Sequence, residues 1–247
     1  MSVMRNFVGM IFLCLPLAAF AGHEGAPVTE GPVTALDKLS SLQQMTAAAP
    51  EGRKFEIQHW QTKNGARVYF VEAHELPMLD VRLVFDAGGA RDGKKTGLAN
   101  VVNSMLDEGT ATRDTSAIAA AFEQVGASYS SSSHRDMAVV QLRVLSDAAF
   151  RDPALSVLAD VVANPQFPAE SFSRIQQSKE VGLKQQEQSP AVLARHKFYK
   201  MLYGDHPYAE PTTGTMRSVA LMTRQELLDF HKRYYVAKNL IIAIVGD

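Results

Sequence analysis

The sequence predicts an α+β fold, a layered sandwich in which a mostly antiparallel sheet is covered by helices. The order of the predicted elements is the first reason, because groups of strands alternate with groups of helices along the chain: strands, helices, strands, helices, strand. Composition is the second, since 46% hydrophobic and 21% charged residues in 247 suit a globular protein with a sizeable core. The formal net charge of -1 gives no electrostatic footprint for nucleic acid.

The N-terminus has the pattern of a secretory signal. Arg5 precedes an apolar stretch over residues 7–20. The small residues Ala19 and Ala21 stand at the two positions that a signal peptidase recognises. The stretch is too short for a membrane span, so we expect an exported, periplasmic protein without a transmembrane anchor. An N-terminal buried helix is the alternative. Cleavage after Ala21 removes Cys14, the only cysteine, and leaves a mature chain without thiol chemistry.

The rest of the chain divides into an arm and a domain. Residues 22–54 are rich in Ala, Pro, Gly and Thr and predict an extended N-terminal arm. Residues 55–247 carry the regular patterns of a folded domain.

Strands are predicted from alternation and turn signals. Asn64-Gly65 lies between two β-prone runs and predicts a hairpin, and residues 79–85 have the period-two pattern of a strand. A stretch of serines predicts an unusual strand before a second alternating one. The predicted strands cover residues 55–62, 67–71, 79–85, 127–133, 137–145 and 240–245, the last of them buried.

Helices are predicted from periodicity and from start and stop residues. Thr96 is the predicted cap of the first helix and Gly109 its stop. The predicted helices cover residues 97–107, 114–125, 150–163, 168–188, 191–202 and 223–235.

The first predicted helix carries an unusual polar face. Asn100, Asn103 and Ser104 stand at i, i+3 and i+4 and therefore share one side of an otherwise apolar helix. Buried polar residues need hydrogen-bond partners or a cavity, so this face is a candidate site.

The frame around these residues is Gly-Leu-Ala-x-x-x-x-x-Met-Leu-x-x-Gly-Thr, from Gly97 to Thr110. It resembles the active-site helix of the pitrilysin/insulinase zinc peptidases, the inverzincins, whose five middle positions read His-x-x-Glu-His. The resemblance extends over residues 55–247 and implies the N-terminal domain of such a protein, with the metalloenzyme fold of the pitrilysin/processing-peptidase type. The other matching pieces are His206-Pro207-Tyr208, Gly214-Thr215, Phe230-His231, Tyr234-Tyr235 and Val245-Gly246-Asp247.

The resemblance assigns each polar residue to a lost role. Asn100 and Ser104 stand where the family has its two zinc-binding histidines, and Asn103 stands where it has the catalytic glutamate. Zinc selects imidazole, thiolate and carboxylate, so the helix predicts no catalytic residue, no metal site and no bound cofactor. The family's third ligand is a glutamate about 75 residues downstream, which makes Glu180 a weak candidate. A solvated charge on a polar helix is the favoured interpretation of Glu180.

Two further groups of residues are candidate sites. His134 and Asp136 with the preceding serines allow a Ser/His/Asp arrangement, although no nucleophile elbow accompanies them. In the family the strand matching the serine-rich segment borders the peptide chamber. This implies a substrate-binding edge at Tyr129, Ser130, Ser131, Ser132 and Ser133, which would pair with an extended peptide through the main chain. An ordinary solvent-facing strand is an equally favoured interpretation of this segment.

These observations favour a non-catalytic homologue of a zinc peptidase. By resemblance it forms a chamber and binds peptide or unfolded polypeptide beside an active subunit of the same family, as in the heterodimers of the mitochondrial-processing-peptidase type. A homologous C-terminal domain is then missing from this sequence. Two alternatives stay open: an active metallopeptidase with unusual ligands, and a stand-alone periplasmic binding or scaffold protein.

Overall fold

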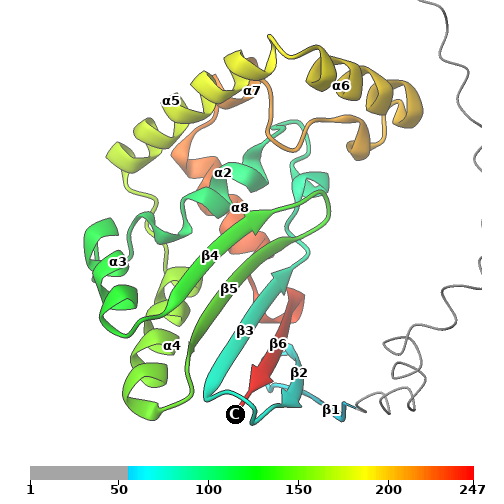
Figure 1. The fold of residues 1–247 in the computed structure, drawn as a ribbon. Helices are drawn as coiled ribbons and strands as arrows, with labels where there is room; N and C mark the ends of the chain where they lie inside the picture. Colours follow the sequence, from blue (N-terminus) through cyan, green and yellow to red (C-terminus); the bar gives the residue numbers. More distant parts are fainter. Residues whose placement is uncertain (1–54) are drawn as a thin grey trace, which may run out of the picture. The chain divides into compact units, whose positions relative to one another are not determined.

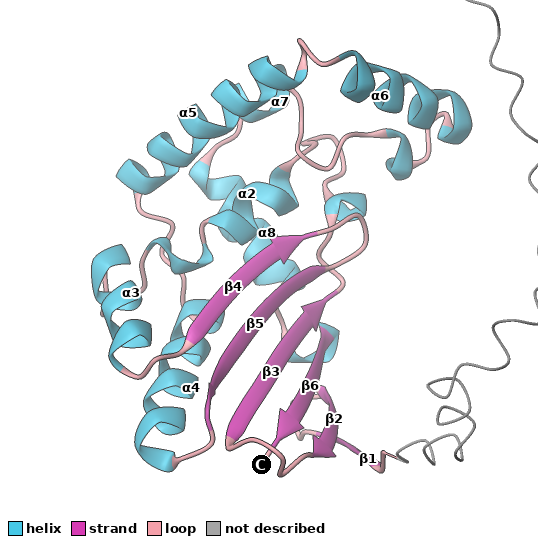
Figure 2. Cartoon of the chain, viewed as in Figure 1, coloured by secondary structure: helices cyan, strands magenta, loops and turns pink. Residues whose placement is uncertain are grey.

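The computed structural model describes residues 55–247, and the predicted signal peptide and arm lie outside the described residues. Figures 1 and 2 show one curved sheet with helices packed against a single face. The six strands are β1 (Ile57–Gln61), β2 (Arg67–Glu72), β3 (Met78–Phe85), β4 (Ser128–Ser133), β5 (Ala138–Leu145) and β6 (Leu240–Gly246). Their order is β1-β2-β6-β3-β5-β4. Only the β2–β6 pair is parallel, so the predicted α+β class and mostly antiparallel sheet are confirmed.

Local sequence explains the strands. Asn64-Gly65 closes the β1–β2 hairpin as predicted, and Gly65 takes a φ of 94° that a side chain would disfavour. In β3, Leu79, Val81 and Phe85 are buried while Arg82 is exposed, which is the alternation of a sheet with one covered face.

The helices follow the predicted segments with adjusted ends. They are α2 (Leu98–Ser104), α3 (Thr115–Gln124), α4 (Ala148–Ala163), α5 (Ala169–Gln186), α6 (Pro190–Tyr203), α7 (Met216–Ala220) and α8 (Arg224–Tyr234). Helix α7 was not predicted; Thr215 and Ser218 cap it reciprocally. Helix α2 ends earlier than predicted, at Ser104, and a 3₁₀ turn over Leu106–Glu108 replaces its last part.

The predicted cap of α2 is wrong. Gly97, not Thr96, is the N-cap residue, and it has no side chain to accept the first amide groups. The Thr96 hydroxyl instead donates to Oγ of Ser218, 3.0 Å away, and so ties the start of α2 to α7.

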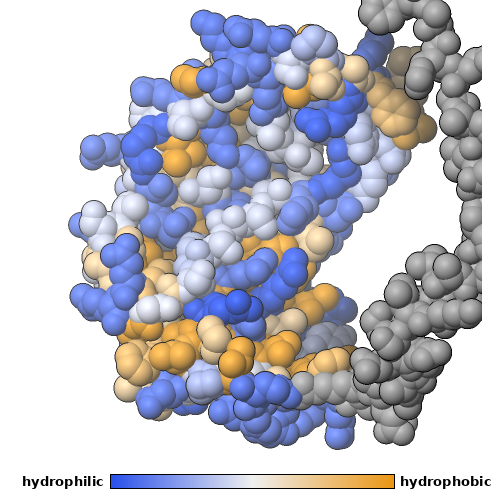
Figure 3. All heavy atoms as spheres, in the orientation of Figure 1, coloured by the Kyte–Doolittle hydropathy of each residue, from blue (hydrophilic) through white to orange (hydrophobic). Residues whose placement is uncertain are grey.

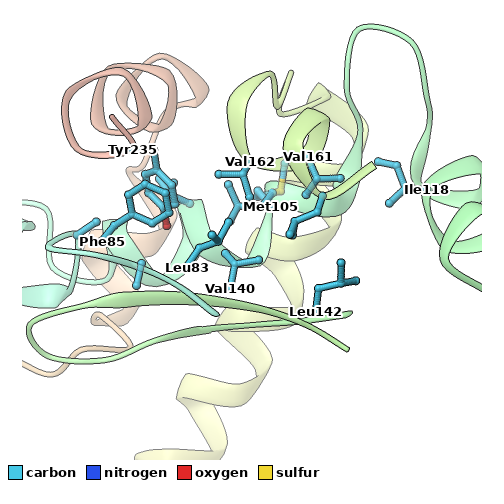
Figure 4. Packing of buried hydrophobic residues seen from close by; sticks show 14 of the residues in the cluster. Leu83, Phe85, Met105, Ile118, Val140, Leu142, Val161, Val162 and Tyr235 are labelled. Atoms are coloured by element: carbon cyan, nitrogen blue, oxygen red, sulfur yellow. The ribbon is translucent and has the colours of Figure 1, made fainter. Parts of the chain in front are cut away.

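The core lies between the sheet and the helices on its covered face (Figure 4). Met105 and Leu106, which directly follow α2, are fully buried, and the rings of Phe85 and Tyr235 pack with centroids 4.7 Å apart. Helix α2 is thus anchored on its apolar side, which fixes the position of its polar side.

The opposite face of the sheet carries no helix within the described chain. Figure 3 shows apolar and polar side chains side by side there. The predicted buried strand, β6, is therefore only partly buried although it is central in the sheet, and Val245 is 43% exposed.

Candidate functional site

The polar face of α2 is the centre of the candidate site. Asn103 is buried, with 3% of its surface exposed, whereas Asn100 and Ser104 are half-buried. Ser104 Oγ donates to the backbone oxygen of Asn100, 2.9 Å away, one helical turn back. Asn100 and Ser104 therefore stand next to each other, as their spacing predicts, whereas Asn103 is buried.

A lysine from α5 contacts this face. Nζ of Lys179 donates to Oδ1 of Asn100 and to Oγ of Ser104, the latter at 2.9 Å. Burial lowers the pKa of Lys179, because removal from water disfavours the charged form. Lys179 immediately precedes Glu180, the candidate from the sequence. Which of the two faces α2 depends on the rotation of α5 in the folded domain, which sequence spacing does not determine.

A cavity of about 320 Å³ opens beside this contact. Asn100, Ser104 and Lys179 contribute polar groups to its wall, and Ile175 and Leu183 of α5 contribute apolar ones. The complete lining is Asn100, Ser104, Ile175, Ser178, Lys179, Gly182, Leu183, Gln186 and Thr213. The site is thus a half-open pocket between α2 and α5 rather than a closed part of the core.

The residues of this pocket do not fit zinc. Neutral amide and hydroxyl oxygens are poor zinc ligands, and an ammonium group repels a divalent cation. No group of three or more His, Cys, Asp or Glu side chains within residues 55–247 is arranged to hold a metal ion. Successive helical residues leave the axis about 100° apart, so Glu180 departs from α5 in a different direction from Lys179.

Asn103 has different surroundings from its two neighbours. Its Nδ2 atom is buried and makes no hydrogen bond within the described chain, and the same holds for the hydroxyl of Tyr235. Burial raises the pKa of Tyr235, and the nearby Asn103 amide offsets part of that effect. Without a carboxylate here, the face has no general base at this position.

Asp92 is the site-supporting residue that the sequence analysis missed. It lies in the charged loop before α2, is 7% exposed, and accepts hydrogen bonds from the backbone N–H groups of Gly97 and Ala99 at 2.6 and 2.7 Å. It thereby does the capping that Gly97 cannot do. An acidic residue five positions before a helix that starts with glycine was the available signal.

We expect Asp92→Asn to change how stability depends on pH. Burial raises the pKa of Asp92 to about 6, against hydrogen bonds from backbone N–H groups that lower it. Because the folded pKa lies above the unfolded value, protonation stabilises the fold below the unfolded pKa, and this contribution is lost as pH rises through about 6. The free energy of unfolding in urea, taken as wild type minus variant, will therefore fall by about 2 kcal/mol between pH ~4 and ~7. A difference independent of pH contradicts the assignment.

The serine-rich strand lies beside α2. Within residues 55–247, β4 pairs only with β5 and forms one edge of the sheet, with Ser131 opposite Val140. Ser131 Oγ donates to the backbone oxygen of Asn103, 3.3 Å away, which joins the edge strand to the polar helix. Tyr129 faces the covered side and stacks on Phe122 with ring centroids 5.1 Å apart. The pale band along β4 in Figure 3 is the polar but uncharged surface of the strand.

The structure does not assemble the Ser/His/Asp arrangement. Ser132 Oγ and Nε2 of His134 are 3.2 Å apart, but Asp136 accepts a hydrogen bond from the hydroxyl of Tyr208 instead of binding His134. His206 caps a 3₁₀ turn and His231 donates to the oxygen of Val162 at 2.9 Å, whereas His74 contacts the carboxylates of Asp247 and Glu72. None of these residues reaches the polar face of α2 through a hydrogen bond within the described chain.

Comparisons with known proteins agree with the fold and the frame of α2. The model of the insulinase family, peptidase family M16, matches residues 67–216. An uncharacterized zinc protease of Rickettsia felis is 26% identical over 186 residues, which are 75% of this chain and 45% of that protein. A non-peptidase homolog, YmxG of Helicobacter pylori, is 24% identical over 181 residues, 73% of this chain and 41% of that protein.

Solved structures give the same result. The M16 inactive domain of Pseudomonas fluorescens is 46% identical with a TM-score of 0.77, covering 78% of this chain and 47% of that chain. The periplasmic protease PqqL of Escherichia coli is 20% identical with a TM-score of 0.70, covering 81% of this chain and 23% of that chain, and shows the fold alone. The chain spans less than half the length of these relatives.

No helix within residues 55–247 is long and apolar enough to cross a membrane. The fold, the frame from Gly97 to Thr110 and the match over residues 67–216 have one explanation. The chain belongs to the insulinase family of peptidases, family M16.

Proposed function

We propose that this chain is a non-catalytic member of the insulinase family that binds extended polypeptide and forms a peptide chamber together with an active peptidase of the same family. The single observation that carries the proposal is the ammonium group of Lys179, which is bonded to Asn100 and Ser104 on the helix of the family motif. A cation supplied by the chain itself occupies the face on which the family binds zinc.

Two features support a binding role in place of catalysis. The edge strand β4 runs beside α2, so an extended peptide paired with β4 through its main chain would pass the polar face. Small side chains at Ser130, Ser131 and Ser132 leave room for such a peptide. One similar protein is named a non-peptidase homolog, and one similar structure is named an inactive domain. These names are consistent with a member of the family that does not cleave peptides.

The proposal extends to the parts of the protein beyond the described residues. Residues 1–21 would direct export to the periplasm, residues 22–54 would form an arm, and residues 55–247 would be the N-terminal domain. The relatives are about twice as long, and their remaining length would correspond to a homologous second domain. The periplasmic protease PqqL, which shares the fold, is consistent with that compartment.

The test is a metal and activity analysis of the protein, alone and mixed with a zinc-binding family member from the same cell. We expect less than about 0.1 zinc per chain and no cleavage of unstructured peptides by the chain alone. Peptides should nevertheless bind, and the mixture should form a complex. Stoichiometric zinc with EDTA-sensitive cleavage would establish the active metallopeptidase with unusual ligands. Peptide binding without any complex would establish the stand-alone binding or scaffold protein.

A further inference from the structure

The charge of Lys179 has no partner in the described structure. Lys179 is half-buried, and among residues 55–247 no carboxylate lies within ion-pair distance of its ammonium group. Both of its hydrogen-bond acceptors, Oδ1 of Asn100 and Oγ of Ser104, are neutral. Buried charges are ordinarily paired, because an unpaired one pays the full cost of leaving water.

The pocket also holds unused hydrogen-bond donors. An ammonium group has three N–H donors, and the two contacts of Lys179 use two of them. Lys179 contacts the Oδ1 atom of Asn100. The Nδ2 group of the same side chain makes no hydrogen bond within the described chain. Two donors and one positive charge therefore border the same cavity of about 320 Å³.

An anion with two oxygens satisfies these groups. A carboxylate accepts hydrogen bonds on both oxygens, and its charge neutralises the ammonium group in a geometry that gives the stronger, charge-assisted bonds. The volume suits a carboxylate with one or two attached residues, and Ile175 and Leu183 supply apolar wall for their side chains.

We propose that the cavity between α2 and α5 is a carboxylate-binding site, in which Lys179 and Asn100 hold a carboxylate of a bound peptide. The inference rests on the proposed peptide-binding function and gives that function a ligand class. The carboxylate comes from the C-terminus of the peptide or from an acidic side chain, and the two sources have the same chemistry at the site.

Three synthetic heptapeptides of alternating valine and threonine separate these sources. The first has a free C-terminal carboxylate, the second a C-terminal amide, and the third an amide with a glutamate at the centre; all are N-acetylated. Titration calorimetry with the purified full chain measures their affinities. We expect at least one of the two charged peptides to bind about tenfold or more tightly than the neutral amide, which is about 1.4 kcal/mol.

The variants identify Lys179 as the source of the preference. Lys179→Met and Lys179→Gln should both remove the preference for the charged peptides, because both remove the positive charge. Lys179→Gln retains a hydrogen-bonding group, so its loss of preference is attributable to the charge. Lys184→Met, on the exposed side of the same helix, should retain it. Labelling with lysine carrying ¹³C at Cε should show a shifted resonance for Lys179 when the charged peptide binds.

The outcomes separate this inference from the proposed function. If all three peptides bind equally, or if Lys179→Met retains the preference, the carboxylate site is wrong while peptide binding stands. Failure of all three to bind contradicts both. Cleavage of the peptides contradicts the non-catalytic function, whatever the affinities are.

Discussion

Zinc binding should return to this chain only when Lys179 is replaced together with the motif residues. The variant with Asn100→His, Asn103→Glu and Ser104→His restores the family's motif but keeps an ammonium group against the positions that the two histidines would occupy. Adding Lys179→Glu removes that charge and supplies a carboxylate from the facing helix. We expect the quadruple variant to bind zinc at least about 100 times more tightly than the triple variant, a difference of about 2.7 kcal/mol in binding free energy. Competition with a chelating dye measures both affinities.

The fourth substitution has an informative control. Lys179→Met in the same background removes the charge without adding a ligand, so it should recover only part of the gain. Equal affinity with methionine and glutamate would show that position 179 supplies no ligand, and Glu180 would then stay a candidate for that role. Peptidase activity of this chain alone should stay low in every variant, because the proposed chamber needs a second subunit.

The fold was largely predictable from the sequence because its signals are local. Asn64-Gly65 specifies a hairpin, a period-two pattern specifies β3, and Asn164 and Gly126 end helices where they were expected to. Each of these features depends on the chemistry of a few neighbouring residues. The partial burial of β6 was not predicted, since it depends on how the helices of the whole fold cover this strand.

Only the part of the site that α2 contributes was predictable from the sequence. The polar face of α2 follows from spacing within a single helix, whereas its partner Lys179 comes from α5 and depends on how that helix is rotated. A shift of one residue along α5 separates Lys179 from Glu180, and sequence spacing does not resolve helix phase to one residue. Asp92 was missed for a related reason, because its capping contact spans a loop and not a helical turn.

A large loss of stability from a single methyl group is expected for Gly97→Ala. Gly97 has a φ of 89°, and a Cβ atom there would lie 2.7 Å from Cα and 2.9 Å from the nitrogen of Gly214. Both are backbone atoms, which cannot move aside as the end of a flexible side chain would. We expect a loss of about 3 kcal/mol or more in the free energy of unfolding, measured in urea.

Gly126→Ala separates the two causes of this loss. Gly126 also has a positive φ, 62°, but a Cβ atom there meets nothing within 4 Å, so it carries the conformational cost alone, about 1 kcal/mol. The excess for Gly97→Ala measures the contact with Gly214, and equal losses would contradict it. Gly97 opens the frame by which the chain resembles its family, and Gly214-Thr215 is another of the matching pieces. Their contact explains that frame as a packing requirement of α2, which holds whether or not the face of the helix binds a metal.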